Sequence, residues 1–325
     1  MKVKLLVSPL ARGAYFEEYT EVASAEFAAR FPDTPFEVEQ FGGLVFLSAS
    51  LDKNGEDMEV NAAALQSVAR LSFVQGAFAV TDTDALKPLQ LEPDFLLPQQ
   101  LVYGWKYQGK TNEMATQLAI NAALRYCDTG RAPQTLLDPM AGKGTTLLWA
   151  LRYGLNSVGI EQDTGAISAL EGHLKKQAKL HRIKHSLAKG SVGPRHKGGK
   201  GKFVSCDMGN HSLRLIAGDS REASKLLGEQ RFDLIVTDLP YGVQFKGGPK
   251  RSPIDTVKDC AKTWVERLRS GGAMAIMFNT YQPTRVQLEA VFKDLECTIH
   301  DFAAPHRMSE SIVRDVLVAT RNRKE

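Results

Sequence analysis

The sequence of 325 residues is poor in cysteine and in long apolar runs. Its four cysteines are scattered and form no CxxC pair, which argues against a disulfide scaffold or a zinc ribbon. No stretch approaches the ~18 consecutive apolar residues that a membrane span needs. The first apolar run, within residues 1–9, is too short for a signal peptide. These shortages predict a cytoplasmic protein with no membrane segment and no metal site.

Acidic residues are missing from one long stretch. None occurs between Glu171 and Asp207, although this stretch contains ten lysines and arginines. The whole chain carries a formal net charge of +4, from 41 basic and 37 acidic residues. When the ten basic residues of this stretch are left out, the rest of the chain has 31 basic and 37 acidic residues, a net charge of −6. The concentrated positive charge favours an arm that binds phosphates; a solvated loop without a partner is the alternative.

At roughly 150 residues per domain, the length predicts about two domains. Residues 1–95 have the strand, helix and hairpin patterns of a small α+β module, with prolines after residue 87 marking a linker. Residues 96–325 alternate strands and helices, which predicts a parallel α/β sheet that ends in an antiparallel pair. Within it we expect a helix over residues 165–185 and irregular chain over the glycine-rich residues 190–201.

Four consecutive predicted strands end at an acidic residue: Asp138, Glu161, Asp219 and Asp238. Ligands of open α/β sheets bind outside the carboxyl ends of the strands. The spacing therefore predicts a site where these carboxylates converge. The alternative is that they are ordinary loop residues and helix N-caps.

The first of these strands is followed by a glycine-containing loop, residues 138–146. A P-loop would need glycine where Leu137 stands, and a dinucleotide fingerprint would need glycine where Leu147 stands. Glu161 follows 17 residues after Gly144, at the end of the next strand, where an acid suits the hydroxyls of a ribose. The loop thus favours a nucleoside-bearing cofactor over a plain structural turn.

The most informative segment is the motif Asp238-Leu239-Pro240-Tyr241, which follows a buried strand. It resembles the (Asp/Asn)-Pro-Pro-(Tyr/Phe) signature of class I S-adenosylmethionine-dependent methyltransferases that act on exocyclic amines, with leucine replacing the first proline. The Asp-Leu-Pro form looks most like the RNA guanine methyltransferases associated with THUMP domains. The resemblance covers about residues 100–320 and includes the glycine loop.

The resemblance implies a Rossmann-like sheet of seven mostly parallel strands with an antiparallel last strand. Residues 1–95 would then be the ferredoxin-like half that precedes THUMP domains, and they are too short for a complete THUMP domain as well. Residues 96–325 would be the methyltransferase domain, with a basic insertion at about 174–205. The implied partner is RNA, either tRNA or rRNA, and the oligomeric state stays open.

The motif suggests a catalytic role for each of its residues. A nucleobase amine is a poor nucleophile because its lone pair is shared with the ring. The Asp238 side chain and the Leu239 carbonyl would accept the amine hydrogens and free that lone pair. Pro240 would hold the turn, and Tyr241 would stack on the base.

By the same resemblance, Glu161 would bind the cofactor ribose and Asp219 the adenine amine. The full set implied for S-adenosyl-L-methionine is Thr111, Asn112, Asp138, Met140, Ala141, Gly142, Gly144, Thr145, Glu161, Asp219 and Ser220. Residues 107–112, which open a predicted helix, are similar to the segment that caps the cofactor in amine methyltransferases. Simple N-capping of that helix by Thr111 is an equally good interpretation.

Other functions stay open at this point. Within the same chemistry, the alternatives are a DNA adenine-N6 or cytosine-N4 methyltransferase and a protein glutamine methyltransferase. Outside it, they are a nicotinamide-dependent oxidoreductase and a non-catalytic RNA-binding protein. His181 and His185, four residues apart in the predicted helix, have the spacing of a zinc pair, but no third ligand is evident.

Overall fold

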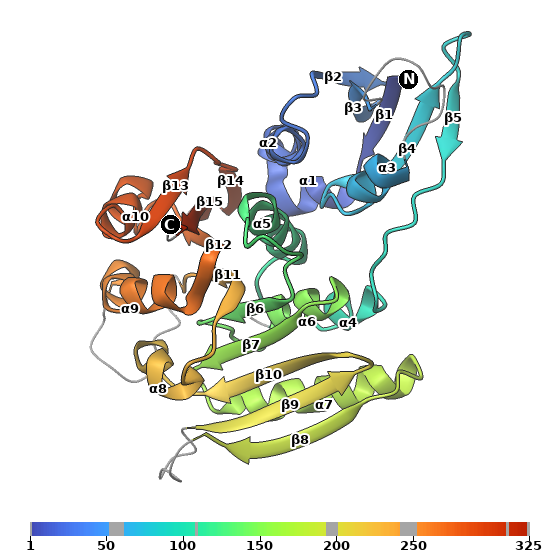
Figure 1. The fold of residues 1–325 in the computed structure, drawn as a ribbon. Coiled ribbons are helices and arrows are strands. Elements are labelled where there is room, and N and C mark those ends of the chain that lie inside the picture. Colours follow the sequence, from blue (N-terminus) through green and yellow to red (C-terminus); the bar gives the residue numbers. More distant parts are fainter. Residues whose placement is uncertain are drawn as a thin grey trace. The chain divides into compact units, whose positions relative to one another are not determined.

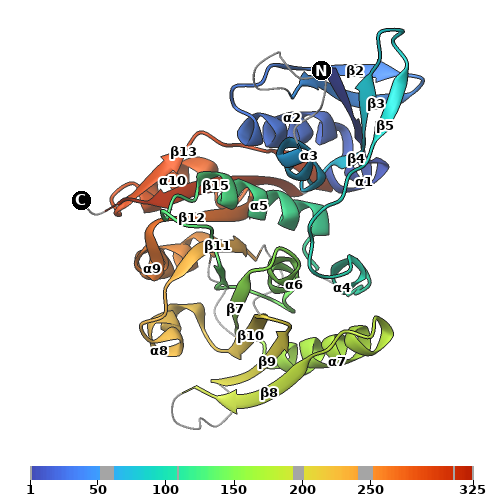
Figure 2. The ribbon, with the colours of Figure 1, turned by 45° about the vertical axis from the view of Figure 1, so that its right-hand side comes forward.

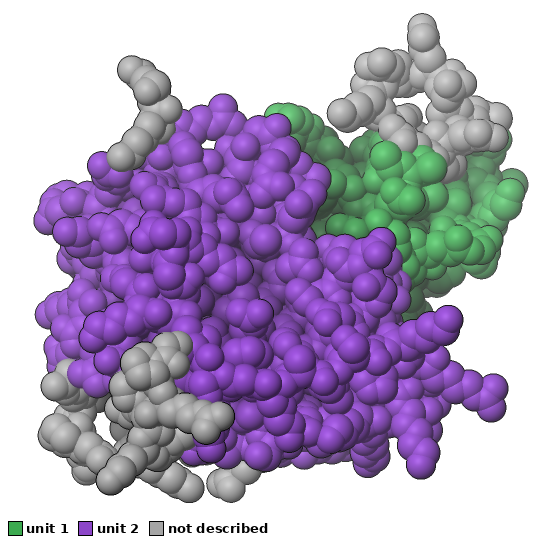
Figure 3. Space-filling view, turned by 60° about the horizontal axis from the view of Figure 1, so that its bottom comes forward, with its two compact units in different colours: residues 1–94, 302–315 green, residues 95–301, 316–325 purple. Residues whose placement is uncertain are grey.

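The computed structural model describes residues 2–51, 62–107, 110–192, 201–240, 252–309 and 312–323. The chain divides into two compact units, residues 1–94 with 302–315 and residues 95–301 with 316–325, which Figure 3 colours separately. Residues 302–315 thus belong to the first unit, although the sequence pattern alone would leave them with the second. The domain limits given above stay a prediction.

The first unit is built on a five-stranded antiparallel sheet with the strand order β2-β3-β1-β4-β5 (Figure 1). In chain order, strands and helices alternate as βαββαβ before the edge strand β5, which together with this strand order is the ferredoxin-like arrangement. The predicted small α+β module is confirmed. The elements are β1 (Lys2–Val7), α1 (Pro9–Tyr15), η1 (Phe16–Glu18), α2 (Tyr19–Arg30), β2 (Phe36–Phe41), β3 (Leu44–Ser50), α3 (Ala62–Ala69), β4 (Val74–Val80), β5 (Leu86–Leu89) and β14 (His306–Ser309).

Pro88, which the sequence assigned to the linker, lies in β5 opposite Phe78. Proline cannot donate a ladder hydrogen bond, so within sheets it is confined largely to edges. Because β5 is the outermost strand, this proline is tolerated there.

The second unit contains a sheet with the strand order β13-β15-β12-β11-β6-β7-β10-β9-β8, and β14 pairs with the first part of β15. Its five central strands, from β12 to β10, are parallel. The elements are α4 (Gln100–Tyr103), α5 (Glu113–Tyr126), β6 (Thr135–Asp138), α6 (Thr145–Arg152), β7 (Asn156–Glu161), α7 (Gly165–Leu180), β8 (Ser186–Ser191), β9 (Lys202–Met208), β10 (His211–Ala217), η2 (Ser220–Glu222), α8 (Ala223–Leu227), β11 (Phe232–Asp238), α9 (Pro253–Arg267), β12 (Leu268–Asn279), α10 (Arg285–Phe292), β13 (Cys297–His300) and β15 (Ile312–Arg321).

The predicted class of fold is confirmed, but the sheet is larger than the seven strands expected. The additional strands are the hairpin β8–β9, which extends the sheet beyond β10, and the short β14. The predicted helix over residues 165–185 ends at Leu180, and Arg182 has a φ of 53° that no right-handed helix accommodates. Residues 190–191 belong to β8, whereas residues 193–200 lie outside the described part.

Helices cover both faces of the central strands (Figure 2). Leu137 and Ile235 point to the face that packs against Trp264 of α9. Leu136 and Leu234 alternate with them, are equally buried, and face the opposite side. Because helices cover both faces, ligands bind this sheet beyond the ends of its strands. In the described part of the chain, no helix is long and apolar enough to span a bilayer.

The strand order reverses next to β6. The chain proceeds from β6 to β7 and β10 on one side, and then returns to place β11 on the other side of β6. Such a topological switch point opens a crevice at the carboxyl ends of the two strands that flank it. Asp138 ends β6 and Asp238 ends β11, so the two predicted functional loops follow the strands that flank this switch point.

Candidate functional site

The glycine loop is fastened to the neighbouring strand β7. Ala141 N donates to the Ile160 carbonyl at 2.9 Å. Gly144 precedes α6 with a φ of 95°, a conformation that glycine adopts at little cost. A side chain at Gly159 would bring its Cβ to 2.7 Å from the Cβ of Ala141, so this glycine lets the loop lie directly against β7.

Asp138 lies beneath this loop, with 2% of its surface exposed. Its Oδ1 accepts hydrogen bonds from Met140 N at 3.0 Å and from the Thr237 hydroxyl at 2.9 Å. Burial raises the pKa of Asp138 to about 7, helped by the nearby negative charge of Asp238 and opposed by these donors. The side chain thus joins the glycine loop to the end of β11, and its predicted proximity to the cofactor stays a prediction.

Glu161, at the end of β7, holds the glycine loop from the other side. Its Oε2 accepts from Gly142 N at 2.8 Å, and its Oε1 accepts from Asp163 N at 2.7 Å. Burial raises the pKa of Glu161, and the two backbone donors oppose that rise. The carboxylate is thereby oriented at the carboxyl edge of the sheet, the place predicted for a ribose-binding acid.

Asp219 and Ser220 follow β10. Asp219 caps η2 by accepting from Arg221 N at 2.9 Å, and it also forms an ion pair with the Arg221 guanidinium. The Ser220 side chain contacts the buried Trp264, whose Nε1 donates to its hydroxyl at 3.4 Å. Both residues lie at the predicted edge, but the described contacts of their side chains are with the protein.

Thr111 is not the N-cap of α5, contrary to the alternative interpretation given above. The capping residue is Asn112, whose Oδ1 accepts from Met114 N at 2.9 Å and from Ala115 N at 3.2 Å. Thr111 instead donates its hydroxyl hydrogen to Asp238 Oδ2 at 2.7 Å, across 127 positions in the sequence. Simple N-capping by Thr111 is therefore wrong, because Asn112 caps the helix with its side-chain oxygen.

The turn after β11 continues the sheet pairing for one more residue. Leu239 N donates to the Met277 carbonyl at 2.9 Å, and the Leu239 side chain is buried. This anchoring fixes the backbone from which Asp238 and the Leu239 carbonyl project. Pro240 is the last residue described before a gap, and Tyr241 lies outside the described residues.

A segment before α5 approaches the glycine loop, a contact that the sequence did not reveal. The Tyr107 hydroxyl and Thr145 Oγ1 are 2.8 Å apart, and Lys143 Nζ lies 4.6 Å from the centre of the Tyr107 ring. Burial raises the pKa of Tyr107 to about 12, which keeps its hydroxyl protonated at neutral pH. The available signal was the resemblance of residues 107–112 to a segment that caps the cofactor, although one sequence gives Tyr107 no partner.

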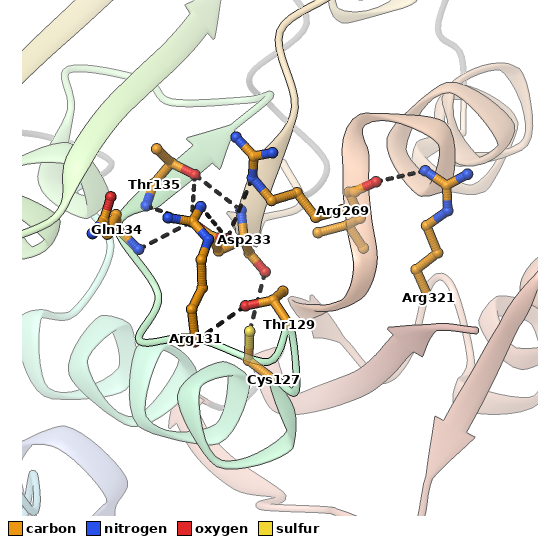
Figure 4. A network of polar contacts seen from close by, with 9 residues as sticks. Cys127, Thr129, Arg131, Gln134, Thr135, Asp233, Arg269 and Arg321 are labelled. Carbon is orange, nitrogen blue, oxygen red and sulfur yellow. Dashed lines mark hydrogen bonds and ion pairs between the residues drawn. The ribbon is translucent and has the colours of Figure 1, made fainter. Parts of the chain in front are cut away.

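A different carboxylate, Asp233, lies at the opposite ends of the strands, near the start of β11 (Figure 4). It has no exposed surface and accepts from the backbone N–H groups of Gln134 and Thr135, each at 3.0 Å. Arg131 and Arg269 contact its Oδ1 at 3.1 and 3.4 Å. Because Asp233 is fully buried between backbone donors and two arginines, we interpret it as a structural anchor.

The histidine pair does not have the predicted geometry. α7 ends at Leu180, so His181 and His185 do not share one helical face. His185 Nδ1 instead lies 3.1 Å from the Ile183 carbonyl. Among the residues that the structure describes, no group of three or more His, Cys, Asp or Glu side chains is arranged to hold a metal ion.

Together, the mostly parallel sheet, the glycine loop at its switch point and the acid that ends the next strand define a class I methyltransferase, which takes its methyl group from S-adenosyl-L-methionine. The model of the family "RMKL-like, methyltransferase domain" matches residues 104–297. The chain belongs to this family, which confirms the predicted enzyme class and cofactor.

Two solved structures illustrate the likeness. TrmN from Thermus thermophilus is 12% identical, with a TM-score of 0.50; the match covers 98% of this chain and 99% of TrmN. The 16S rRNA N2 G1207 methyltransferase RsmC from T. thermophilus, solved with AdoMet and guanosine, is 20% identical with a TM-score of 0.40; the match covers 94% of this chain and 62% of RsmC. A search of curated proteins finds no match.

Proposed function

We propose that this enzyme methylates the exocyclic amine of a nucleobase in RNA, and specifically N2 of guanine in tRNA or rRNA. The observation that carries the proposal is the position of Asp238, which ends β11 at the switch point beside the glycine loop. An acceptor at this point faces the crevice in which open α/β sheets hold their ligands.

The turn supplies what the reaction needs. The Asp238 carboxylate and the Leu239 carbonyl accept the two amine hydrogens, which favours a pyramidal nitrogen with an available lone pair. S-adenosylmethionine supplies an electrophilic methyl group when bound. A bond forms from nitrogen to the methyl carbon as the bond from carbon to sulfur breaks, and the cationic amine then loses a proton to Asp238 or to water. The residues therefore act mainly by positioning and electrostatics.

The cofactor-binding roles belong to the same proposal. Glu161 ends β7 with its carboxylate oriented by two backbone donors, which suits the two hydroxyls of a ribose. Asp219 follows the next strand along the sheet, one strand further from the switch point, where an adenine amine would find an acceptor. The backbone of residues 140–145 borders the methionine portion, because the glycines allow close approach.

RNA as the polymer is supported by two features. The Asp-Leu-Pro form of the motif resembles that of the guanine methyltransferases of RNA. The exposed basic residues at the end of α7 offer charge for phosphates.

A cytoplasmic location stays a prediction.

The variant Asp238→Ala tests the catalytic role. We expect calorimetry to show that S-adenosylmethionine binding survives, while methyl transfer to RNA falls by at least about a hundredfold, because one acceptor of the amine is lost. The matched control is Asp294→Ala, which removes an exposed carboxylate after α10 and should leave both quantities unchanged. Undiminished transfer by Asp238→Ala would remove the basis of the proposal.

The substrate itself is best identified by mass spectrometry of nucleosides from total tRNA and rRNA, prepared with and without the gene. Loss of N2-methylguanosine from one RNA class would identify both product and polymer. Loss of a different methylated base would correct the base, and an unchanged nucleoside profile would contradict an RNA substrate.

A further inference from the structure

We infer that Thr111 is a positioning residue, which orients the Asp238 carboxylate for the substrate amine. The inference rests on the proposed function and assigns a role that the sequence pattern did not indicate. Its central observation is the 2.7 Å hydrogen bond from the Thr111 hydroxyl to Asp238 Oδ2. The bond joins the segment before α5 directly to the predicted catalytic turn.

Thr111 is held in place from both sides. On one side, Asn112 caps α5 through two backbone N–H groups. On the other side, Lys110 Nζ donates to the carbonyls of Val102 and Trp105 at 2.6 and 2.7 Å and forms an ion pair with Glu113. The backbone around Thr111 is therefore fixed without any contribution from its own hydroxyl.

The direction of the bond determines what it does. A hydroxyl has a single hydrogen, and that of Thr111 is directed to Oδ2, so Thr111 restricts rotation of the carboxylate. An ionised carboxylate has about four acceptor sites, and the bond from Thr111 occupies one of them.

The β-branched side chain suits this task. Threonine has fewer accessible χ1 rotamers than an unbranched residue, so its hydroxyl is presented in a nearly fixed direction. Valine has the same shape but no hydroxyl, whereas serine keeps the hydroxyl and loses only the methyl group. These two variants separate the hydrogen bond from the packing of the side chain.

The test compares Thr111→Val and Thr111→Ser with the wild type in methylation of the RNA identified above. We expect kcat of Thr111→Val to fall roughly ten- to a hundredfold, the rate equivalent of one hydrogen bond to a charged group. Its KM for RNA and its affinity for S-adenosylmethionine should stay within about twofold, and Thr111→Ser should recover most of kcat. Thr298→Val, at an exposed position of β13, is the control for a surface threonine.

A role in packing alone would lower the stability of Thr111→Ser, which loses the methyl group, and would leave kcat of both folded variants unchanged, which would overturn the inference. So would loss of S-adenosylmethionine affinity with kcat intact, because Thr111 would then act on the cofactor. A crystal structure of Thr111→Val bound to S-adenosylhomocysteine decides the matter independently of the substrate. We expect the Asp238 carboxylate to be rotated or disordered, and an unchanged carboxylate would overturn the inference even if the enzyme methylates no RNA.

Discussion

Asp138 and Asp238 end neighbouring parallel strands, yet their side chains have different surroundings. Asp138 is buried beneath the glycine loop, where it accepts from Met140 N and the Thr237 hydroxyl. Asp238 is only partly buried and accepts from Thr111. One carboxyl group is therefore enclosed by the chain, whereas the other lies partly exposed at the end of its strand.

This difference has a consequence for pH. Burial raises the pKa of Asp138 from an ordinary value of 3.8 to about 7 in the folded protein. Between these two values the folded chain keeps a proton that the unfolded chain has lost. The contribution of Asp138 to stability is therefore fully present below about pH 4, falls as pH rises, and is lost above about pH 7.

Asp138→Asn should remove this dependence, because the amide is neutral at every pH and still offers an oxygen to both donors. Urea unfolding at several pH values between 4.5 and 8 measures it, with Asp294→Asn as the surface control. We expect the stability of Asp138→Asn relative to wild type to increase as pH rises through this range. A difference that is constant with pH would show that Asp138 ionises normally in the folded protein.

At the residue level, the sequence predicted which carboxylates gather at one edge, because strand ends can be recognised from local patterns. It did not predict which of two adjacent residues caps α5, since threonine and asparagine are both good N-caps. Thr111 donates its hydroxyl hydrogen to Asp238, which is distant in sequence and near in space, and Asn112 is the cap. One sequence contains no information on such a pairing.

At the scale of elements, Asp233 joins the beginnings of β6 and β11. Its carboxylate accepts from the backbone N–H groups of Gln134 and Thr135 and from the Thr135 hydroxyl, and it lies opposite two arginines (Figure 4). Both strands carry their functional loops at the other end. The network thus keeps the two strands in register without touching the site.

Asp233→Ala should lower the free energy of unfolding by about 2–4 kcal/mol, because buried backbone donors lose their acceptor. Denaturant unfolding measures this, and Asp294→Ala should change stability by less than about 0.5 kcal/mol. We expect the affinity for S-adenosylmethionine of folded Asp233→Ala to equal that of the wild type. A lower affinity of the folded variant for S-adenosylmethionine would show that this network influences the cofactor site.

The hairpin β8–β9 shows where pattern reasoning failed for an element. Its first strand, β8, is rich in lysine, serine and glycine, which are poor indicators of a strand. The pairing is nonetheless regular from Ser186 with Asp207 to Ser191 with Lys202, and the Phe203 ring occupies the space that a side chain at Gly190 would need. Tertiary packing on β10 therefore overrides local preference.

At the scale of the whole molecule, the distribution of charge is the feature that bears on a polymer substrate. Glu171 is the last acid before the basic stretch, and it forms ion pairs with both Lys175 and Lys189. Hydrogen bonds from these two lysines lower the pKa of Glu171. The stretch that follows carries further exposed basic residues with no acid until Asp207, which favours contact with a polyanion.

Replacing Lys176, Lys179 and Lys184 by glutamine tests this contact, because all three are exposed at the end of α7 or just beyond it. Each phosphate contact contributes roughly 0.7–0.9 to the slope of log affinity against log salt concentration. If all three lysines bind phosphates, the slope for bulk tRNA should fall by about 2 to 3. Filter binding between low and physiological salt measures it.

The control removes the same charge elsewhere: Lys225, Lys258 and Lys262, exposed on α8 and α9, are replaced by glutamine together. Both triple variants lower the net charge equally, so a general effect of charge would change their slopes alike. A local phosphate contact would change only the first. Equal slopes would therefore show that the basic stretch is a solvated surface, and that RNA reaches the crevice beside Asp238 by other contacts.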